Sequence, residues 1–260
     1  FSKRADEKSG FTTRSILCVP LRSKGRVIGV IEGINKEKGD FLEDDIAVMT
    51  ALANQVAIAV ENAQLYTELK DAFHSMAEAL AGAIELRDPQ TGIHIQRVME
   101  YSLIIGRYLG LNQEEIETLK LSAALHDIGK LGVSDGILLK QGYLDEEELR
   151  AMKCHTDYGT EILTRIKLLD RVIPVVRSHH EHYDGKGYPD GLKNGDIPVA
   201  AKIIAVADAF DAMITDRPYR KKLSVEGAFE ELKRCSGTQF APEAVDALFT
   251  AWNNGELRFS

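Results

Sequence analysis

Two short runs rich in β-branched residues stand in the first part of the chain. They cover Arg14 to Leu21 (RSILCVPL) and Val27 to Asn35 (VIGVIEGIN), and the turn-like sequence Ser-Lys-Gly at 23–25 separates them. Runs of this length and composition on either side of a turn are typical of a β-hairpin. The pattern therefore predicts a hairpin over residues 14–35.

A long helical pattern follows the hairpin. The acidic residues Glu43, Asp44 and Asp45 suit the exposed N–H groups of a first helical turn. Apolar or small residues then recur every three or four positions, as far as about Leu86. They are Leu52, Val56, Ala59, Ala63, Tyr66, Leu69, Phe73, Met76 and Leu80. A run this long favours a coiled-coil connector, for which we expect a parallel homodimer.

Asp88-Pro89 is expected to break this helix, because proline lacks an N–H and disfavours helical backbone before it. The pattern beyond it is again helical. It predicts helices near residues 91–109, 113–127, 145–166, 170–181, 198–213, 224–234 and 241–252, with loops at 129–142 and 184–198. The expected fold class is therefore mainly α, with one small β element.

The composition is that of an ordinary globular protein. Of 260 residues, 44% are hydrophobic and 28% are charged, which leaves room for about two domains. We expect no membrane segment, since no apolar run looks long enough. The net charge of -8 disfavours binding to nucleic-acid polymers. Cys18, Cys154 and Cys235 show no disulfide or metal spacing, which fits a reducing cytoplasm.

Histidines gather at the ends and inner faces of the predicted helices. Six of the seven lie there, namely His94, His126, His155, His179, His180 and His182, while His74 stands apart on the connector. Adjacent histidines on a helix point about 100° apart, so His179 and His180 share a pocket only if it is wide. For an isolated pair, a surface or capping role is the alternative. Here the stretch HHEHYDGKGYP at 179–189 predicts part of a metal site.

Two carboxylates stand in otherwise apolar helices. Asp127 follows His126 at the end of LSAALHD, and Asp208 lies within AAKIIAVADAFDAMI. A buried charge needs a partner or a cation, so metal binding accounts for both. Helix capping for Asp127 and a backbone hydrogen bond for Asp208 are the alternatives. Lys130 follows closely, where its ammonium could hold a phosphate oxygen.

The first part of the chain resembles a sensor family. GFTTRSILCVPL, GVIEGINK and ALANQVAIAVENAQLY are similar to the C-terminal half of a GAF domain, over residues 1–66. GAF domains often bind a small ligand such as a cyclic nucleotide. The resemblance covers only half of such a domain, so it assigns no ligand. An unrelated hairpin packed on a helix is the alternative.

The remaining motifs together resemble the HD-GYP subfamily of HD metal-dependent phosphohydrolases, over about residues 77–255. These motifs are His94, HDxxxK, His155, HHExxDGxGYP and Asp208 with RPYR. Members are bacterial signalling enzymes that hydrolyse cyclic di-GMP to pGpG and then to GMP. The resemblance implies an all-helical HD-type domain at 88–260 in a bacterial protein, after the α/β GAF fragment at 1–66. The helical pattern places the connector at 67–87, and the cysteines favour the cytoplasm.

The resemblance also implies roles for single residues. The family's metal ligands fall on His94, His126, Asp127, His155, His179, His180 and Asp208, and its catalytic positions on His126, Asp127 and Lys130. Its substrate contacts fall on Lys130, Arg217 and Arg220, and its GYP loop on Gly187, Tyr188 and Pro189. A solvated basic patch with Lys221 and Lys222 is the alternative for the two arginines.

The expected cofactor is a pair of divalent metal ions. Asp127 and Asp208 are the candidates to bridge them, because a carboxylate has two oxygens. Several imidazoles with two carboxylates suit six-coordinate iron, or next manganese, better than tetrahedral structural zinc. The metals would acidify a water for in-line attack on phosphorus, so no nucleophilic side chain is needed.

Three positions depart from the family pattern. Some members carry a glutamate four residues before the first histidine ligand, where it helps to hold a third metal; here Gln90 stands there, which predicts a two-metal site. The usual KPG is Lys140-Gln141-Gly142, and His182 matches no family ligand.

The leading hypothesis is a cyclic di-GMP phosphodiesterase that a GAF sensor regulates through the connector, with a protein partner at the GYP loop as a further expectation. A receptor or adaptor that binds cyclic di-GMP with negligible turnover is one alternative. A hydrolase of another cyclic dinucleotide, such as cyclic GMP-AMP, is the other.

Overall fold

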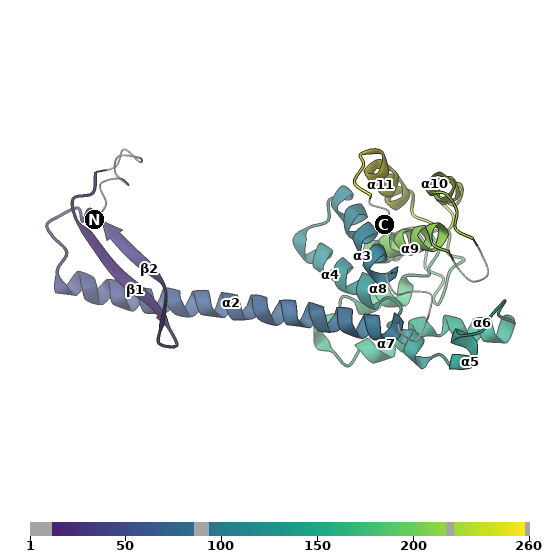
Figure 1. The fold of residues 1–260 in the computed structure, drawn as a ribbon, viewed down its shortest axis with the longest axis horizontal. Helices are drawn as coiled ribbons and strands as arrows, with labels where there is room; N and C mark the ends of the chain where they lie inside the picture. The colour runs from purple at the N-terminus through teal and green to yellow at the C-terminus, as the bar shows by residue number, and fades with distance from the viewer. Residues whose placement is uncertain (1–11, 86–93, 217–220, 258–260) are drawn as a thin grey trace. The chain divides into compact units, whose positions relative to one another are not determined.

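The computed structural model describes residues 12–85, 94–216 and 221–257 (Figure 1). The chain divides into two compact units, residues 1–73 and 74–260. The fold is mainly α, as the hydrophobic pattern predicts. Gln90, Arg217, Arg220 and the predicted helix break at Asp88-Pro89 lie outside the described residues.

The first unit contains the predicted hairpin. Strands β1 (Ile16–Ser23) and β2 (Arg26–Ile34) pair antiparallel, with Ile16 opposite Ile34 and Ser23 opposite Arg26. The two turn residues Lys24 and Gly25 both have positive φ, of 46° and 79°. This is the geometry that matches the twist of a two-residue hairpin. The hairpin prediction is therefore confirmed.

Helix α2 (Glu43–Glu85) is a single element of 43 residues, which confirms the long helical pattern up to the limit of the described residues. Asp45, in the first turn, accepts a hydrogen bond from the backbone N–H of Leu42, the residue before the helix, at 2.7 Å. Many residues of the predicted apolar stripe are exposed in the single chain, including Tyr66, Leu69 and Met76.

Helix α2 also bears on the membrane expectation. Over Glu43–Ile84 it is long and apolar enough to cross a membrane by length and composition, alone among the helices of the described residues. Only 11% of the window that passes this test is buried. The expectation that no apolar run is long enough to cross a membrane was therefore wrong for α2. A single helix of this kind remains a weak indication of a span, since core helices and signal sequences pass the same test.

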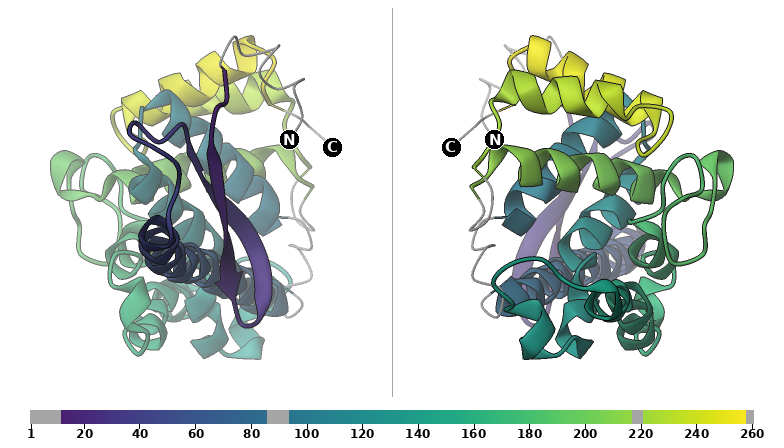
Figure 2. Two further views of the ribbon diagram at one scale, coloured as in Figure 1. Left: turned by 90° about the vertical axis from the view of Figure 1, so that its left-hand side faces the viewer. Right: turned by 90° about the vertical axis from the view of Figure 1, so that its right-hand side faces the viewer.

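The second unit contains the remaining helices. They are α3 (His94–Tyr108), α4 (Gln113–Leu125), α5 (Asp135–Leu138), α6 (Glu146–Lys153), α7 (His155–Leu163), α8 (Ile173–Ser178), α9 (Val199–Ile214), α10 (Val225–Arg234) and α11 (Pro242–Asn253). Short 3-10 turns lie at η1 (Ile128–Gly132), η2 (Lys167–Leu169) and η3 (Asn194–Asp196). Figure 2 shows α10 and α11, yellow-green and yellow, on one side of the green α9.

Some helix boundaries differ from the predicted ones. The predicted helix at 145–166 is two helices, α6 and α7, which meet at Cys154, and the predicted helix at 170–181 is reduced to α8. The predicted loop at 129–142 contains η1 and α5. Periodicity could not show these breaks, because the apolar positions on both sides of a short turn still face one core.

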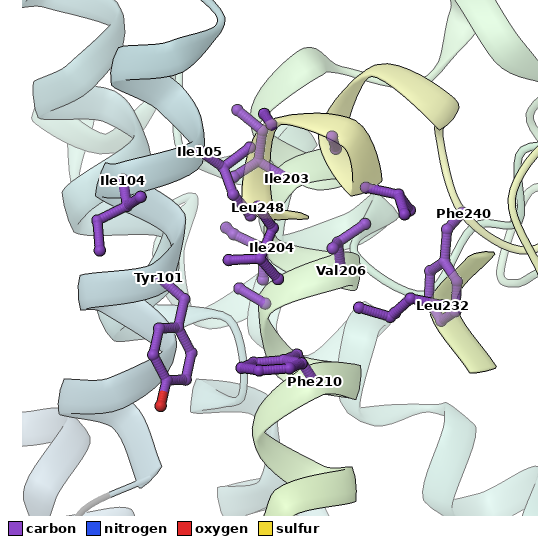
Figure 3. Packing of buried hydrophobic residues seen from close by; sticks show 14 of the residues in the cluster. Tyr101, Ile104, Ile105, Ile203, Ile204, Val206, Phe210, Leu232, Phe240 and Leu248 are labelled. Carbon is purple, nitrogen blue, oxygen red and sulfur yellow. The ribbon is translucent and has the colours of Figure 1, made fainter. Parts of the chain in front are cut away.

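The core forms where α9 packs against its neighbours. Phe210 on α9 is fully buried, and its ring lies 5.3 Å from that of Tyr101 on α3 and 4.9 Å from that of Phe229 on α10. Figure 3 shows Tyr101 and Phe210 facing each other between the two helices, with Ile105, Ile203 and Ile204 nearby. This packing holds α3 and α9 together, and both helices carry residues of the predicted metal site.

Candidate metal centre

Six of the seven predicted ligands come from the ends of four helices in the second unit. His94 is the first residue of α3, and His126 directly follows α4. Asp127 precedes η1, and His155 begins α7. His179 and His180 follow α8, whereas Asp208 lies inside α9. The ends of these helices lie close together, so their terminal side chains can share one site.

The Asp127 carboxylate lies between two sets of imidazoles. Among the described residues, Asp127, His155, His179 and His180 form one group of potential ligands, and His94, His126 and Asp127 form another. Asp127 Oδ1 lies 3.5 Å from His155 Nε2, while Oδ2 lies 3.4 Å from His126 Nε2. Each oxygen thus faces a different set, which is the arrangement that a bridging carboxylate requires.

Backbone hydrogen bonds orient three of the imidazoles. Nδ1 of His126, His155 and His179 lies 2.8, 2.8 and 2.6 Å from the carbonyl oxygens of Ala123, Met152 and Val176, respectively. A carbonyl oxygen can only accept, so each Nδ1 carries the proton and donates it. The lone pair of each Nε2 therefore points into the cluster, as in histidine metal ligands.

One buried nitrogen in this cluster is left without a hydrogen bond. His126 Nε2 is buried and has no hydrogen-bond partner within the described part of the chain. Buried polar atoms are rarely left in this state, because the loss of hydration is uncompensated. A cation at this position would satisfy the lone pair, so the donor set fits a divalent metal.

Asp208 lies on the His94 side of the site. Its Oδ1 is 3.3 Å from His94 Nε2, and its side chain is 25% exposed. Among the described residues it belongs to neither of the two ligand groups. The structure thus places Asp208 next to one set of imidazoles, while its predicted role as a second bridging carboxylate stays a prediction.

A second aspartate, which the sequence reasoning missed, orients His94. Asp211 is 1% exposed, and its Oδ2 lies 2.7 Å from His94 Nδ1. Arg97 contacts the same carboxylate through Nε, and through Nη2 at 3.0 Å. The signal was present in the sequence, since His94 and Arg97 stand three residues apart on α3, as Asp208 and Asp211 do on α9. Residues at this spacing share a helix face.

Two carboxylates also change the proton affinity of His94. Burial lowers its pKa, but the hydrogen bonds to Asp208 and Asp211 outweigh burial and raise the pKa to about 10. In the metal-free protein the His94 imidazole is thus protonated between the two carboxylates.

Substitution of Asp211 by asparagine is expected to weaken metal binding by roughly 10- to 100-fold, because His94 loses the carboxylate that fixes its tautomer. Competition with a metal-sensitive chelator dye measures this affinity. Asp246→Asn, on an exposed position of α11, is the matched control. Equal metal affinity in the parent and in Asp211→Asn would contradict the assignment.

Lys130 lies beside the Asp127 carboxylate, with Nζ 2.7 Å from Oδ2. Burial of Asp127 raises its pKa, but the charges of Lys130 and His126 outweigh burial and hold the pKa well below its usual range. Lys130 also lines the cavity described below, and its predicted contact with a substrate phosphate stays a prediction.

Three further imidazoles of the cluster, those of His155, His179 and His180, are neutral at physiological pH. Burial lowers the pKa of His155 and His179 and lowers that of His180 to about 3. Neutral imidazole is the form that binds metal, so burial prepares these side chains as ligands.

For the metal-free protein this burial predicts lower stability in acid. Below pH 6.5 the unfolded chain binds protons on these histidines, whereas the folded chain does not until about pH 3 in the case of His180. Stability contributed by the neutral imidazoles is therefore lost as the pH falls through this window. Urea unfolding of chelator-treated protein should show a lower midpoint at pH 5 than at pH 7. An unchanged or higher midpoint would contradict the burial of these histidines.

A cavity of about 500 Å³ opens over the cluster. Its polar lining includes His94, Arg97, Asp127, Lys130, Lys140, His155, His180, Tyr188, Asp208 and Asp211. Ile137, Leu138, Leu144, Leu149 and Met152 line another part. A cavity of this size accommodates a ligand such as a dinucleotide in part or in full.

The predicted GYP loop reaches the site through its tyrosine. Tyr188 lines the cavity, and its ring stacks on that of His180 with centroids 4.8 Å apart. Gly187 and Pro189 do not line it, although both are described; a Cβ on Gly187 would lie 2.2 Å from His182 N. His182 itself is half-buried and lies in neither ligand group of the described residues.

Glu181, which the sequence reasoning also missed, holds this loop in place. Its carboxylate is buried and accepts hydrogen bonds from three successive backbone N–H groups. These are Asp190 N at 2.7 Å, Gly191 N at 2.9 Å and Leu192 N at 3.1 Å. The contacts tie the segment after Tyr188 to the end of α8, beside two of the predicted ligands.

Comparison with known proteins assigns both parts of the chain. An HD domain matches residues 78–244, and a GAF domain matches residues 1–60, which confirms the two resemblances. The 3′3′-cGAMP-specific phosphodiesterase 2 of Vibrio cholerae is 37% identical over 216 residues, which cover 82% of this chain and 41% of the relative. The cyclic di-GMP phosphodiesterase of Thermotoga maritima is 41% identical over 186 residues, which cover 71% of this chain and 50% of the relative.

A solved structure shares the fold. The cyclic GMP-AMP specific phosphodiesterase of V. cholerae superposes with a TM-score of 0.58 at 21% identity, over 70% of this chain and 49% of that one. The chain spans about half the length of the curated relatives it matches. The HD domain match extends over more than half of the 260 residues, and the chain belongs to the HD domain family.

Proposed function

We propose that this protein is a metal-dependent phosphodiesterase that hydrolyses cyclic di-GMP to pGpG, GMP or both. The observation that carries the proposal is the Asp127 carboxylate, which lies between two sets of imidazoles and lines a cavity. The names of the relatives from T. maritima and V. cholerae support a cyclic dinucleotide as the substrate class.

Two divalent cations are proposed at this site, iron before manganese. His155, His179 and His180 would hold one, His94, His126 and Asp208 the other, and Asp127 would contact both. Bound divalent cations supply Lewis-acid stabilisation of phosphoryl oxygens and acidify a water for attack on phosphorus. A mixed set of imidazole and carboxylate donors is suited to iron and manganese.

The chain's own residues would orient the reaction. Lys130 would hold a phosphoryl oxygen and balance its charge, since it lines the cavity beside Asp127. Asp211, which Arg97 contacts, accepts a hydrogen bond from His94 Nδ1 and orients that ring. Tyr188 stacks on the His180 ring and so would fix its orientation. Outside the described residues, Arg217 and Arg220 remain proposed contacts to the dinucleotide.

A second candidate substrate is a mixed cyclic dinucleotide, 3′3′-cyclic GMP-AMP. The relative with the longest match reported above bears that name, and the cavity residues do not by themselves distinguish the two purines. Both substrates share the phosphodiester chemistry of the site.

The architecture proposed for regulation has a GAF part at 1–66, a connector at 67–87 and the HD-GYP domain at 88–260. Tyr66, Leu69 and Met76 on α2 are 72%, 68% and 70% exposed in the single chain. Exposed apolar side chains at helical spacing suit a second copy of the helix, so we propose a parallel homodimer. A cytoplasmic setting and a protein partner at the GYP loop belong to the same proposal.

The proposed activity is tested by product chromatography. Protein purified without oxygen is loaded with ferrous iron or manganese and incubated with cyclic di-GMP or 3′3′-cyclic GMP-AMP. Appearance of linear dinucleotide or mononucleotide with the intact protein supports the proposal. A metal-loaded protein that binds a cyclic dinucleotide without product would instead be a receptor.

A further inference from the structure

Tyr143 is the most exposed large apolar or aromatic side chain of the described residues, and it lies at the cavity. It stands in the segment between α5 and α6, is 94% exposed, and lines the cavity over the candidate metal centre. An aromatic ring this exposed has stacking capacity that none of the described residues uses. A ligand in the cavity could therefore cover this ring.

The lining of the cavity divides into two chemically different parts. One part is polar and charged, with Asp127, Lys130 and Asp208 beside the imidazoles. The other comes from α5, α6 and the segment between them, and apart from Lys140 and Gly142 it is apolar or aromatic, with Ile137, Leu138, Tyr143, Leu144, Leu149 and Met152. A cyclic dinucleotide is divided in the same way, into charged phosphodiesters and flat purine bases. The polar part suits a phosphate, and the apolar part suits a base.

The segment that carries Tyr143 is fastened at both ends. Glu148 on α6 accepts a hydrogen bond from Lys140 Nζ at 2.6 Å and another from Asp145 N at 2.8 Å. Asp145 in turn caps α6. Between these points Gly142 adopts a φ of +119°, which side-chain-bearing residues rarely adopt. These hydrogen bonds restrain the backbone of the segment that carries Tyr143. The restraint reduces the conformational entropy lost when a ligand stacks on the ring.

We propose that Tyr143, with the apolar part of the cavity, forms a stacking subsite for one purine base of the cyclic dinucleotide. The inference rests on the proposed function and specifies its substrate contacts. Stacking on an aromatic side chain tolerates every base, so this subsite would strengthen binding without selecting guanine over adenine.

Equilibrium dialysis of the metal-loaded full chain with cyclic di-GMP tests the subsite. Tyr143→Phe keeps the flat ring and is expected to bind within about twofold of the parent, whereas Tyr143→Leu keeps apolar area but loses the ring. Because one stacked base is lost, Tyr143→Leu should bind cyclic di-GMP roughly 5- to 100-fold more weakly than the parent. In turnover, KM should rise while kcat stays unchanged, because stacking stabilises substrate and transition state alike.

Metal content, thermal midpoint and oligomeric state of each variant serve as structural readouts. Leu139→Ala is the matched control, since Leu139 is 43% exposed and lies four residues before Tyr143 but does not line the cavity. Equal affinity of Tyr143→Leu and the parent would overturn the subsite and leave the proposed function standing. A loss shared by Leu139→Ala, or a change of oligomeric state confined to the Tyr143 variants, would also overturn it.

The two proposals can fail separately. Absence of product from a parent that still binds the dinucleotide would refute the hydrolase. The ratio of the dissociation constants of Tyr143→Leu and the parent would still show whether Tyr143 contributes to binding. A parent that neither binds nor hydrolyses cyclic dinucleotides would refute both.

Discussion

Asp127→Asn is expected to abolish tight metal binding and to lower phosphodiesterase activity by roughly a thousandfold, equivalent to about 4 kcal/mol of transition-state stabilisation. An amide offers one neutral oxygen and an N–H donor where the parent offers two anionic oxygens. Because those oxygens face His126 on one side and His155 on the other, one substitution removes a ligand from both groups. Elemental analysis after dialysis gives the metal content, and product chromatography gives the rate.

The matched control for this substitution is Asp170→Asn, at an exposed position outside the cavity lining. It should retain full metal content and activity. Circular dichroism should show Asp127→Asn folded, so that the loss is traced to the site. Full metal occupancy in Asp127→Asn would show that Asp127 is not the shared ligand.

Gly129→Ala is expected to destabilise the protein by more than about 3 kcal/mol or to prevent folding. A Cβ at this position would lie 1.8 Å from the backbone oxygen of His155 and 2.4 Å from Gly159 N. Both are backbone atoms of α7, so no side chain can move aside. The clash would push η1 away from α7 and would separate Asp127 from His155.

Urea unfolding, followed by circular dichroism, measures this effect. Gly136→Ala on α5 is the control, because a Cβ there meets nothing within 4 Å and its φ is not positive. It should leave stability unchanged or slightly raised, since alanine restricts the unfolded chain. Parent-like stability of Gly129→Ala would mean that η1 and α7 are not packed this closely.

Patterns that are local in the chain could be found from the sequence. Three- and four-residue periodicity predicted α2 and placed α4, α9, α10 and α11 within two residues of their observed ends. Two β-branched runs and a turn predicted the hairpin. Each of these elements is governed by neighbours a few residues away, which a sequence pattern records directly.

The predicted ligands were found by a different route. Histidine and aspartate are costly to bury without a partner, so His126, Asp127 and Asp208 stand out within apolar helices. Their resemblance to a known family then placed them in one site. The structure brings all seven predicted ligands to one region of the second unit, while the number and identity of metal ions remain proposals.

Asp211, Glu181 and Tyr143 show what local patterns could not supply. Asp211 meets His94 across 117 positions of sequence, and Glu181 contacts backbone N–H groups that any residue could donate. Nothing near Tyr143 in sequence says that it lines the cavity.

The sequence by itself determined which segments are helical or extended and which residues can bind metal, because both depend on side-chain chemistry and short-range spacing. Only the tertiary structure decided which oxygen of Asp127 faces which imidazole, which carboxylate orients His94, and which aromatic ring remains uncovered. Those properties depend on how α3, α7, α8 and α9 pack, and packing joins atoms that the order of residues leaves far apart.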